Sequence, residues 1–161
     1  MIGVLNAYHF DLTPGNYQET YMPMMMSYLK KVMPDSGFKV FDVAQDKFPK
    51  DLSECQGYII TGSPASCYDN TPWIKKLVQL VKDMDAKKIP LLGICFGHQL
   101  IAFALGGRVQ VSDKGWGIGN RKFGIINPKR WMRPLPLENS CSLLFSHQDQ
   151  VVELPQKATL I

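Results

Sequence analysis

Short apolar runs alternate along the chain with segments in which apolar residues recur every three or four positions. Each run is brief, almost wholly apolar and bounded by turn residues, a pattern typical of buried strands. The predicted strands cover residues 2–7, 38–43, 57–61 and 90–94. Alternation of strands and helices favours an α/β fold, with a mainly parallel sheet flanked by helices and ligands at the carboxyl ends of its strands.

Two segments between these strands have helical periodicity. The first is predicted to end at Pro34 and to pack one apolar stripe against the core. This stripe comprises Tyr21, Met24, Met25, Tyr28, Leu29 and Val32. The second begins with Thr71 as N-cap and Pro72 in the first turn, positions that favour these residue types. Its packed face is predicted to contain Trp73, Leu77, Leu80, Val81 and Met84.

The helical pattern is lost after Gly106 and Gly107. Short candidate strands, which indicate added strands or a hairpin edge, lie at residues 108–111, 122–126 and 143–145. Residues 116–119 are predicted to form a loop beside the ligand pocket, and residues 158–161 an apolar strand that ends without a polar cap. We therefore treat residues 1–161 as a single domain and expect it to be incomplete at its C-terminus.

Composition narrows the class of protein. Of the 161 residues, 45% are hydrophobic and 20% charged, as in a globular domain, and the net charge of +4 is spread over scattered lysine pairs. No basic leader and no apolar segment of membrane-spanning length is present, so we expect a cytoplasmic protein with no nucleic-acid or membrane partner. The four cysteines form no Cys-x-x-Cys pair and only three histidines accompany them. Neither a metal, a disulfide framework nor an organic cofactor is therefore indicated.

The strongest chemical signal is Cys95, which stands between Gly93 and Gly97 where a predicted strand meets a predicted helix at residues 97–105. Glycines two residues either side of a nucleophile are typical of an elbow, in which the backbone is strained and strand and helix approach closely. The helix N-terminus would favour the thiolate form of the cysteine. The alternative is a buried core thiol, which the flanking glycines make the less favoured interpretation.

Two backbone amides are candidates for an oxyanion hole. The N–H of Phe96 follows the cysteine directly, and the turn at Gly62 and Ser63 follows the neighbouring predicted strand. Both should therefore lie at the same carboxyl edge of the sheet. Gln99 lies one helical turn after Cys95 and can face the same pocket, although a glutamine on the helix surface is the alternative.

Residues 93–99, Gly-Ile-Cys-Phe-Gly-His-Gln, resemble the Gly-x-Cys-x-Gly-x-Gln signature of the class I glutamine amidotransferases, whose nucleophile is a cysteine. Residues 61–64 are similar to the oxyanion loop of that family, and residues 146–151, Ser-His-Gln-Asp-Gln-Val, to its later substrate-binding turn. The Ser-His-x-Asp form is most similar to the amidotransferase domain of GMP synthetase and to γ-glutamyl peptide hydrolases. The resemblance implies a flavodoxin-like amidotransferase domain.

The resemblance also implies roles for individual residues. Cys95 would be the nucleophile, and Gly62 and Phe96 the amide donors to the oxyanion. The substrate would be bound by Ser63, Gln99, Ser146, His147, Gln148 and Asp149. Of these, the residues of the Ser-His-x-Asp turn would hold the amino-acid head of glutamine, largely through main-chain atoms.

The catalytic base is not evident from the sequence. The family takes it from a downstream His-Pro-Glu segment, which residues 1–161 do not contain, and the available histidines are His9, His98 and His147. We expect His147 to bond nearby backbone, His98 to pack under the sheet and His9 to lie in a loop near the strand edge.

Three functions are consistent with these features, and whether the chain as it stands is an enzyme is left open. The first is hydrolysis of glutamine to glutamate and ammonia through a γ-glutamyl thioester on Cys95, with a synthetase partner as ammonia acceptor. The second keeps the same attack but takes a γ-glutamyl peptide as substrate. The third is a binding module that keeps the glutamine pocket without turnover.

Overall fold

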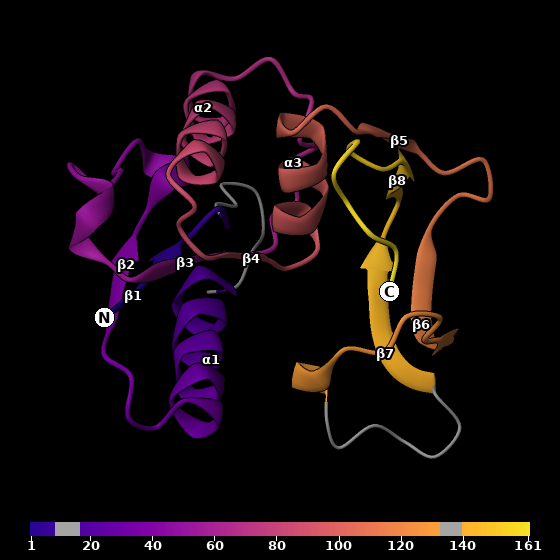
Figure 1. Cartoon of the computed structure of the whole chain (residues 1–161), viewed down its shortest axis with the longest axis horizontal. Coiled ribbons are helices and arrows are strands. Elements are labelled where there is room, and N and C mark those ends of the chain that lie inside the picture. Colours follow the sequence, from indigo (N-terminus) through magenta and orange to yellow (C-terminus); the bar gives the residue numbers. More distant parts are fainter. Residues whose placement is uncertain (9–16, 133–139) are drawn as a thin grey trace.

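The first 93 residues contain a four-stranded parallel sheet, which lies between the first and second α-helices in Figure 1. The computed structural model describes residues 1–8, 17–132 and 140–161. The sheet has the order β2-β1-β3-β4 and consists of β1 (Ile2–Leu5), β2 (Phe38–Phe41), β3 (Gly57–Ile60) and β4 (Leu91–Gly93). Ile60 at the end of β3 is opposite Gly93 at the end of β4, so the loops after these two strands emerge side by side.

Helices cover both faces of the sheet, as the alternating pattern predicts. They are α1 (Tyr17–Val32), α2 (Pro72–Ala86) and α3 (Phe96–Ala104), and Figure 1 shows α1 and α2 on opposite sides of the strands. Leu29 of α1 packs with Val4 and Ile59, while α2 and α3 share a second cluster with the alternate strand residues Leu5 and Ile60. Neighbouring strand residues point to opposite faces, so the two clusters are separate layers of the core.

The packed face of α1 differs from the predicted stripe. Met24, Tyr28 and Val32 are 60%, 62% and 51% exposed, whereas Leu29 is buried. Met25 of the predicted stripe packs in the same cluster as Leu29, together with Met22 and Met26 of a neighbouring apolar stripe and with Met33, which follows the helix. Both stripes of this methionine-rich helix are apolar, so the periodicity does not determine which of them faces the sheet.

The second helix begins and packs largely as predicted. Pro72 is its first residue and Leu77 and Met84 are fully buried, with Ile74 added to the packed face. Thr71 is the N-cap residue, as predicted, but its side chain makes no cap hydrogen bond. Its hydroxyl is buried and lacks a hydrogen-bond partner within the described part of the chain.

The chain after α3 forms two antiparallel pairs. β5 (Arg108–Val111) pairs with β8 (Asp149–Glu153), and β6 (Gly117–Gly124) pairs with β7 (Ser140–His147). The three short candidate strands at residues 108–111, 122–126 and 143–145 thus correspond to β5, β6 and β7. β8 was not predicted.

Two predictions for this part of the chain are wrong. Residues 158–161 form no strand; Ala158 closes a turn onto Pro155 and the Leu160 carbonyl accepts a hydrogen bond from Asn127. A short apolar run becomes a strand only where a partner strand takes up its backbone groups. Residues 117–119 of the expected loop belong to β6, because they pair with β7.

Short 3₁₀ helices complete the described elements at Val43–Gln45, Leu52–Glu54 and Arg130–Met132. Among the helices that the structure describes, none is both long enough and apolar enough to cross a bilayer. All four cysteines are free thiols, and Cys55 and Cys67 are buried.

Candidate active site

Cys95 occupies a sharp turn between β4 and α3. Its backbone angles are φ 51° and ψ −107°, a region that residues with a side chain rarely adopt. A Cβ at Gly93 would lie 2.4 Å from the Gly97 carbonyl carbon, and one at Gly97 would lie 2.5 Å from the Ile60 carbonyl oxygen. The two glycines therefore allow β3, β4 and α3 to approach closely enough to form the elbow that the spacing predicts.

The thiol of Cys95 is not poised as a thiolate by the described residues. Cys95 is exposed to the cavity, but partial desolvation raises the pKa of its thiol, and the Asp149 carboxylate raises it further, while a hydrogen bond with the Phe96 backbone N–H opposes both. The first amide of α3 thus favours the thiolate, as expected, but desolvation and Asp149 outweigh it and the pKa of Cys95 is raised. Ionisation of Cys95 at neutral pH requires a proton acceptor beside the sulfur.

The loop after β3 lies against the elbow. The Thr61 hydroxyl accepts a hydrogen bond from the Ala7 N–H at 3.0 Å and donates to the Gly62 carbonyl at 3.1 Å, which ties the loop to the end of β1. A Cβ at Gly62 would lie 3.5 Å from the Tyr21 hydroxyl and 3.8 Å from the Cys95 Cβ. Gly62 is thus next to the cysteine, as the sequence pattern predicts.

The turn between β7 and β8 is fixed by its buried aspartate. One carboxylate oxygen of Asp149 accepts a hydrogen bond from the Ser66 hydroxyl at 2.6 Å and the other accepts one from the Tyr68 hydroxyl at 3.1 Å. Its backbone carbonyl accepts from Gln99 Nε2 at 2.8 Å and from His147 Nδ1 at 2.9 Å. The contacts with Ser66 and Tyr68 join the turn to the loop after β3 and the contact with Gln99 joins it to α3, while the His147 contact lies within the turn.

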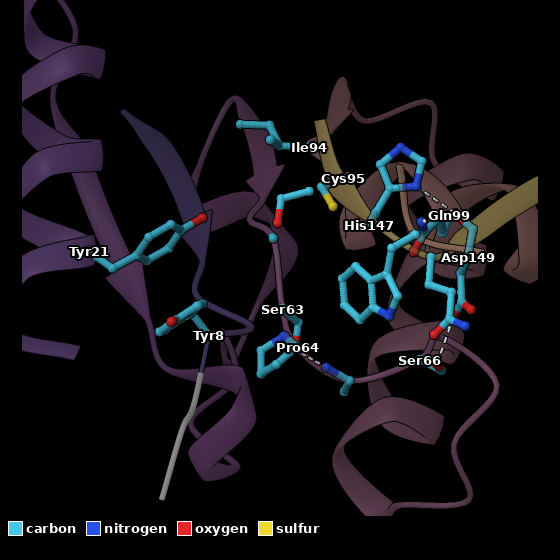
Figure 2. A pocket seen from close by; sticks show the side chains of 15 residues that line it. Tyr8, Tyr21, Ser63, Pro64, Ser66, Ile94, Cys95, Gln99, His147 and Asp149 are labelled. Atoms are coloured by element: carbon cyan, nitrogen blue, oxygen red, sulfur yellow. Dashed lines mark hydrogen bonds between the residues drawn. The ribbon is translucent and has the colours of Figure 1, made fainter. Parts of the chain in front are cut away.

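A single cavity of about 470 Å³ joins these features (Figure 2). All the predicted site residues line it except Phe96, whose side chain is buried against Trp73 at a ring distance of 5.8 Å. The sequence-predicted residues in its wall are Cys95, Gly62, Ser63, Gln99, Ser146, His147, Gln148 and Asp149.

Gln99 and Asp149 have their polar groups largely committed within the protein. The Gln99 side chain is 6% exposed and donates to a backbone carbonyl, and the Asp149 carboxylate accepts two hydroxyl hydrogen bonds. The backbone carbonyls of Gln148 and Asp149 also accept hydrogen bonds within the protein, the first from the Ser112 N–H and the second from Gln99 and His147. That the turn holds a ligand through main-chain atoms stays a prediction. That Gln99 contacts bound glutamine stays a prediction.

The histidines are placed differently from one another. His147 bonds the backbone of Asp149 as expected, and its Nδ1 must carry the proton because a carbonyl only accepts, which leaves Nε2 of the neutral ring unprotonated. The expectation that His98 packs under the sheet is wrong: it is exposed and lines a second cavity with Cys95 and His147. Partial desolvation and the His147 ring lower the pKa of His98. His9 lies outside the described residues.

Several residues near the site were missed from the sequence. Tyr8, Tyr21 and Ser66 line the cavity, and Tyr68 supports it through Asp149. Trp116, from the segment predicted to lie beside the pocket, also lines it. Tyr8 follows β1, so the rule that ligands gather at the carboxyl ends of parallel strands could have identified it. Tyr21 was assigned to the packed stripe of α1, where its type and spacing gave no sign of a second role.

The sequence is similar to those of known proteins. Residues 19–160 match the family model described as glutamine amidotransferase class-I. Gamma-glutamyl peptidase 3 of Arabidopsis thaliana is 35% identical over 128 residues, covering 76% of this chain and 51% of that protein. The glutamine-hydrolysing GMP synthase of Porphyromonas gingivalis is 32% identical over 111 residues, covering 69% of this chain and 21% of that protein.

The fold also matches a solved structure. A glutamine amidotransferase from Thermotoga maritima superimposes with a TM-score of 0.78 at 24% identity, over 98% of this chain and 65% of the other. The chain spans about half the length of the Arabidopsis gamma-glutamyl peptidase it matches. The family match over most of the sequence, together with the flavodoxin-like sheet and helices, shows that this chain belongs to the class I glutamine amidotransferase family.

Proposed function

We propose that this domain cleaves a γ-glutamyl amide bond through a thioester on Cys95, with glutamine as substrate in the full-length protein. The observation that carries the proposal is the strained elbow at Cys95, which opens into a cavity shared with Gly62 and the Ser-His-x-Asp turn. A structural cysteine needs neither a positive φ nor two flanking glycines held against backbone atoms.

The reaction proceeds in two halves. The Cys95 sulfur attacks the γ-carbonyl carbon, the C–N bond breaks, and ammonia leaves after taking up a proton. Water then adds to the thioester, the C–S bond breaks, and glutamate and the free thiol are released. The backbone N–H groups of Gly62 and Phe96 stabilise the oxyanion in each half.

A base must take the proton of Cys95, because desolvation raises the pKa of its thiol. His147 and His98 are the described imidazoles that share a cavity with Cys95. The unprotonated Nε2 of His147 can accept a proton, while its Nδ1 keeps the ring bonded to Asp149. In the family this role belongs to a histidine downstream of the turn, so His147 acts here only if no such residue reaches the site.

A second candidate function is hydrolysis of γ-glutamyl peptides by the same nucleophile. It is favoured by the gamma-glutamyl peptidases of Arabidopsis thaliana among the relatives, two of which are 35% and 38% identical over 128 residues. The GMP synthase relatives support the first candidate, and with it a synthetase domain or subunit that consumes the ammonia. A binding module without turnover is the third.

Covalent labelling tests the proposal without requiring turnover. We expect a glutamine-like chloroketone, 2-amino-5-chloro-4-oxopentanoate, to add once to Cys95, as read from peptide mass mapping. Cys95→Ser should abolish the adduct, and Cys141→Ser, at a partly exposed cysteine of β7, should leave it unchanged. Equal labelling of Cys141, or none of Cys95, contradicts the proposal.

Turnover separates the remaining alternatives. Ammonia release from glutamine supports the glutaminase, and release of an amino acid from a γ-glutamyl dipeptide supports the peptidase. Labelling of Cys95 with neither product released favours the binding module.

A further inference from the structure

Two tyrosines form an aromatic wall at one end of the cavity. The rings of Tyr8 and Tyr21 stack with centroids 4.4 Å apart and an interplanar angle of 21°. Both line the cavity that contains Cys95. Figure 2 shows them on one side of Cys95, with His147, Gln99 and Asp149 on the other.

The two ends of the cavity differ in chemistry. The end at the β7–β8 turn combines polar side chains with Trp116, whose neighbour Gly117 pairs with His147. The other end offers the stacked rings of Tyr8 and Tyr21 and the Tyr21 hydroxyl. A γ-glutamyl unit whose charged amino-acid head lies at the turn places its γ-carbonyl at Cys95. The group beyond the scissile C–N bond then extends toward the tyrosines.

We propose that the stacked Tyr8–Tyr21 pair is a subsite for the leaving amine of a γ-glutamyl amide and that it selects amines with an aromatic or apolar body. This inference rests on the proposed γ-glutamyl chemistry at Cys95. Ammonia, the leaving group from glutamine, presents no surface for a ring to contact. An aromatic amine packs against these rings and removes apolar surface from water.

The size of the site and the anchoring of Tyr21 support this assignment. The cavity of about 470 Å³ lies within the range of roughly 300–1,000 Å³ that holds drug-sized ligands, and free glutamine would fill only part of it. The Tyr21 hydroxyl lies against Gly62, 3.5 Å from where a Cβ of that residue would stand, and the Tyr21 ring stacks on Tyr8. The ring is thereby held in place before a ligand enters, which lowers the entropic cost of binding.

Protection of Cys95 from labelling measures the subsite directly. The glutamine-like chloroketone is applied to the chain in the presence of glutamine or of γ-glutamyl-4-nitroanilide, and the concentration of each that halves the labelling rate is compared. We expect the anilide to protect at a roughly tenfold lower concentration than glutamine. Equal or weaker protection by the anilide overturns the subsite while leaving the proposed function intact, whereas no labelling of Cys95 overturns the function itself.

Three variants test whether the Tyr8–Tyr21 pair causes the preference for the anilide over glutamine. Tyr8→Leu should reduce the anilide-to-glutamine ratio several-fold with little change in protection by glutamine, and Tyr8→Phe, which keeps the ring, should preserve the ratio. Tyr28→Leu, at an exposed tyrosine of α1 that does not line the cavity, is the matched control. If Tyr8→Leu leaves the ratio unchanged, or lowers protection by both ligands alike, the aromatic wall does not select the amine. If Tyr8→Leu does not fold, the ratio of anilide to glutamine protection in the wild-type chain tests the subsite.

Discussion

The parallel sheet with its helices and the β6–β7 hairpin contain similar apolar residues, but these residues are buried only between the sheet and the helices. Leu77 and Val81 of α2 are fully buried against the sheet, whereas Leu144 of β7 is 86% exposed and Ile118 of β6 is 68% exposed. The sheet is covered by helices on both faces, while the hairpin has no such layers within the described residues. Burial, and with it stability, therefore depends on which layers cover an apolar side chain rather than on its type.

The candidate site depends on both regions. Cys95 and Gly62 belong to the sheet and its loops, and the Ser-His-x-Asp turn belongs to β7 and β8. Asp149 joins them, since its carboxylate and carbonyl accept hydrogen bonds from residues of the sheet region. We therefore expect the same type of substitution to change the free energy of unfolding more in the sheet region than in the β6–β7 hairpin. We also expect a substitution of Asp149 to alter the properties of Cys95.

The largest difference should come from truncating a leucine. Leu77→Ala leaves a cavity in a closed core and should lower the free energy of unfolding by about 4 kcal/mol. Leu144→Ala removes an exposed side chain and should change it by less than about 0.5 kcal/mol. Urea unfolding followed by circular dichroism measures both, and similar losses for the two variants would contradict the contrast.

A methyl group added to glycine gives the next largest effect. Gly93→Ala forces a Cβ against the backbone of Gly97 and His98 and should cost about 3 kcal/mol. It should also reduce chloroketone labelling of Cys95, because the elbow must open. Gly124→Ala in β6 meets no atom within 4 Å and serves as the control. If Gly93→Ala leaves the free energy of unfolding unchanged, the elbow does not need the close approach of residue 93 to Gly97.

Neutralising Asp149 tests the connection between the regions. Asp149→Asn weakens the contacts with Ser66 and Tyr68 and should destabilise the chain by about 1–3 kcal/mol. The Asp149 carboxylate raises the pKa of Cys95, so its loss should lower that pKa and move the pH midpoint of Cys95 alkylation by iodoacetamide downward. Asp113→Asn, at an exposed position, should leave the midpoint unchanged. An unchanged or higher midpoint in Asp149→Asn would exclude the electrostatic coupling.

The smallest effect is expected at the β5–β8 ion pair. Arg108 and Glu153 approach to 2.6 Å, but their side chains are 54% and 62% exposed. Solvent screening limits such a pair, so Arg108→Ala should cost less than about 1 kcal/mol. The difference from wild type should shrink further when thermal unfolding is repeated in 1 M salt. A loss comparable to that of Asp149→Asn would mean that β5 and β8 depend on this pair.

Local patterns in the sequence determined the four parallel strands, the helices between them and the elbow at Cys95. Such features are encoded within a dozen neighbouring residues, because periodicity and the need for glycine at a close approach are local properties. The Gly-x-Cys-x-Gly spacing therefore predicted the turn correctly, and the alternation of elements placed Gly62 next to it.

Only the tertiary structure decided which stripe of α1 faces the sheet, that residues 149–153 form a strand, and that Tyr8 and Tyr21 stack beside the cysteine. It also decided that Asp149 is bound by Ser66, 83 residues away in sequence, and that the pKa of Cys95 is raised rather than lowered. Each of these depends on groups that are distant in sequence and meet only in the folded chain, so no local pattern specifies them.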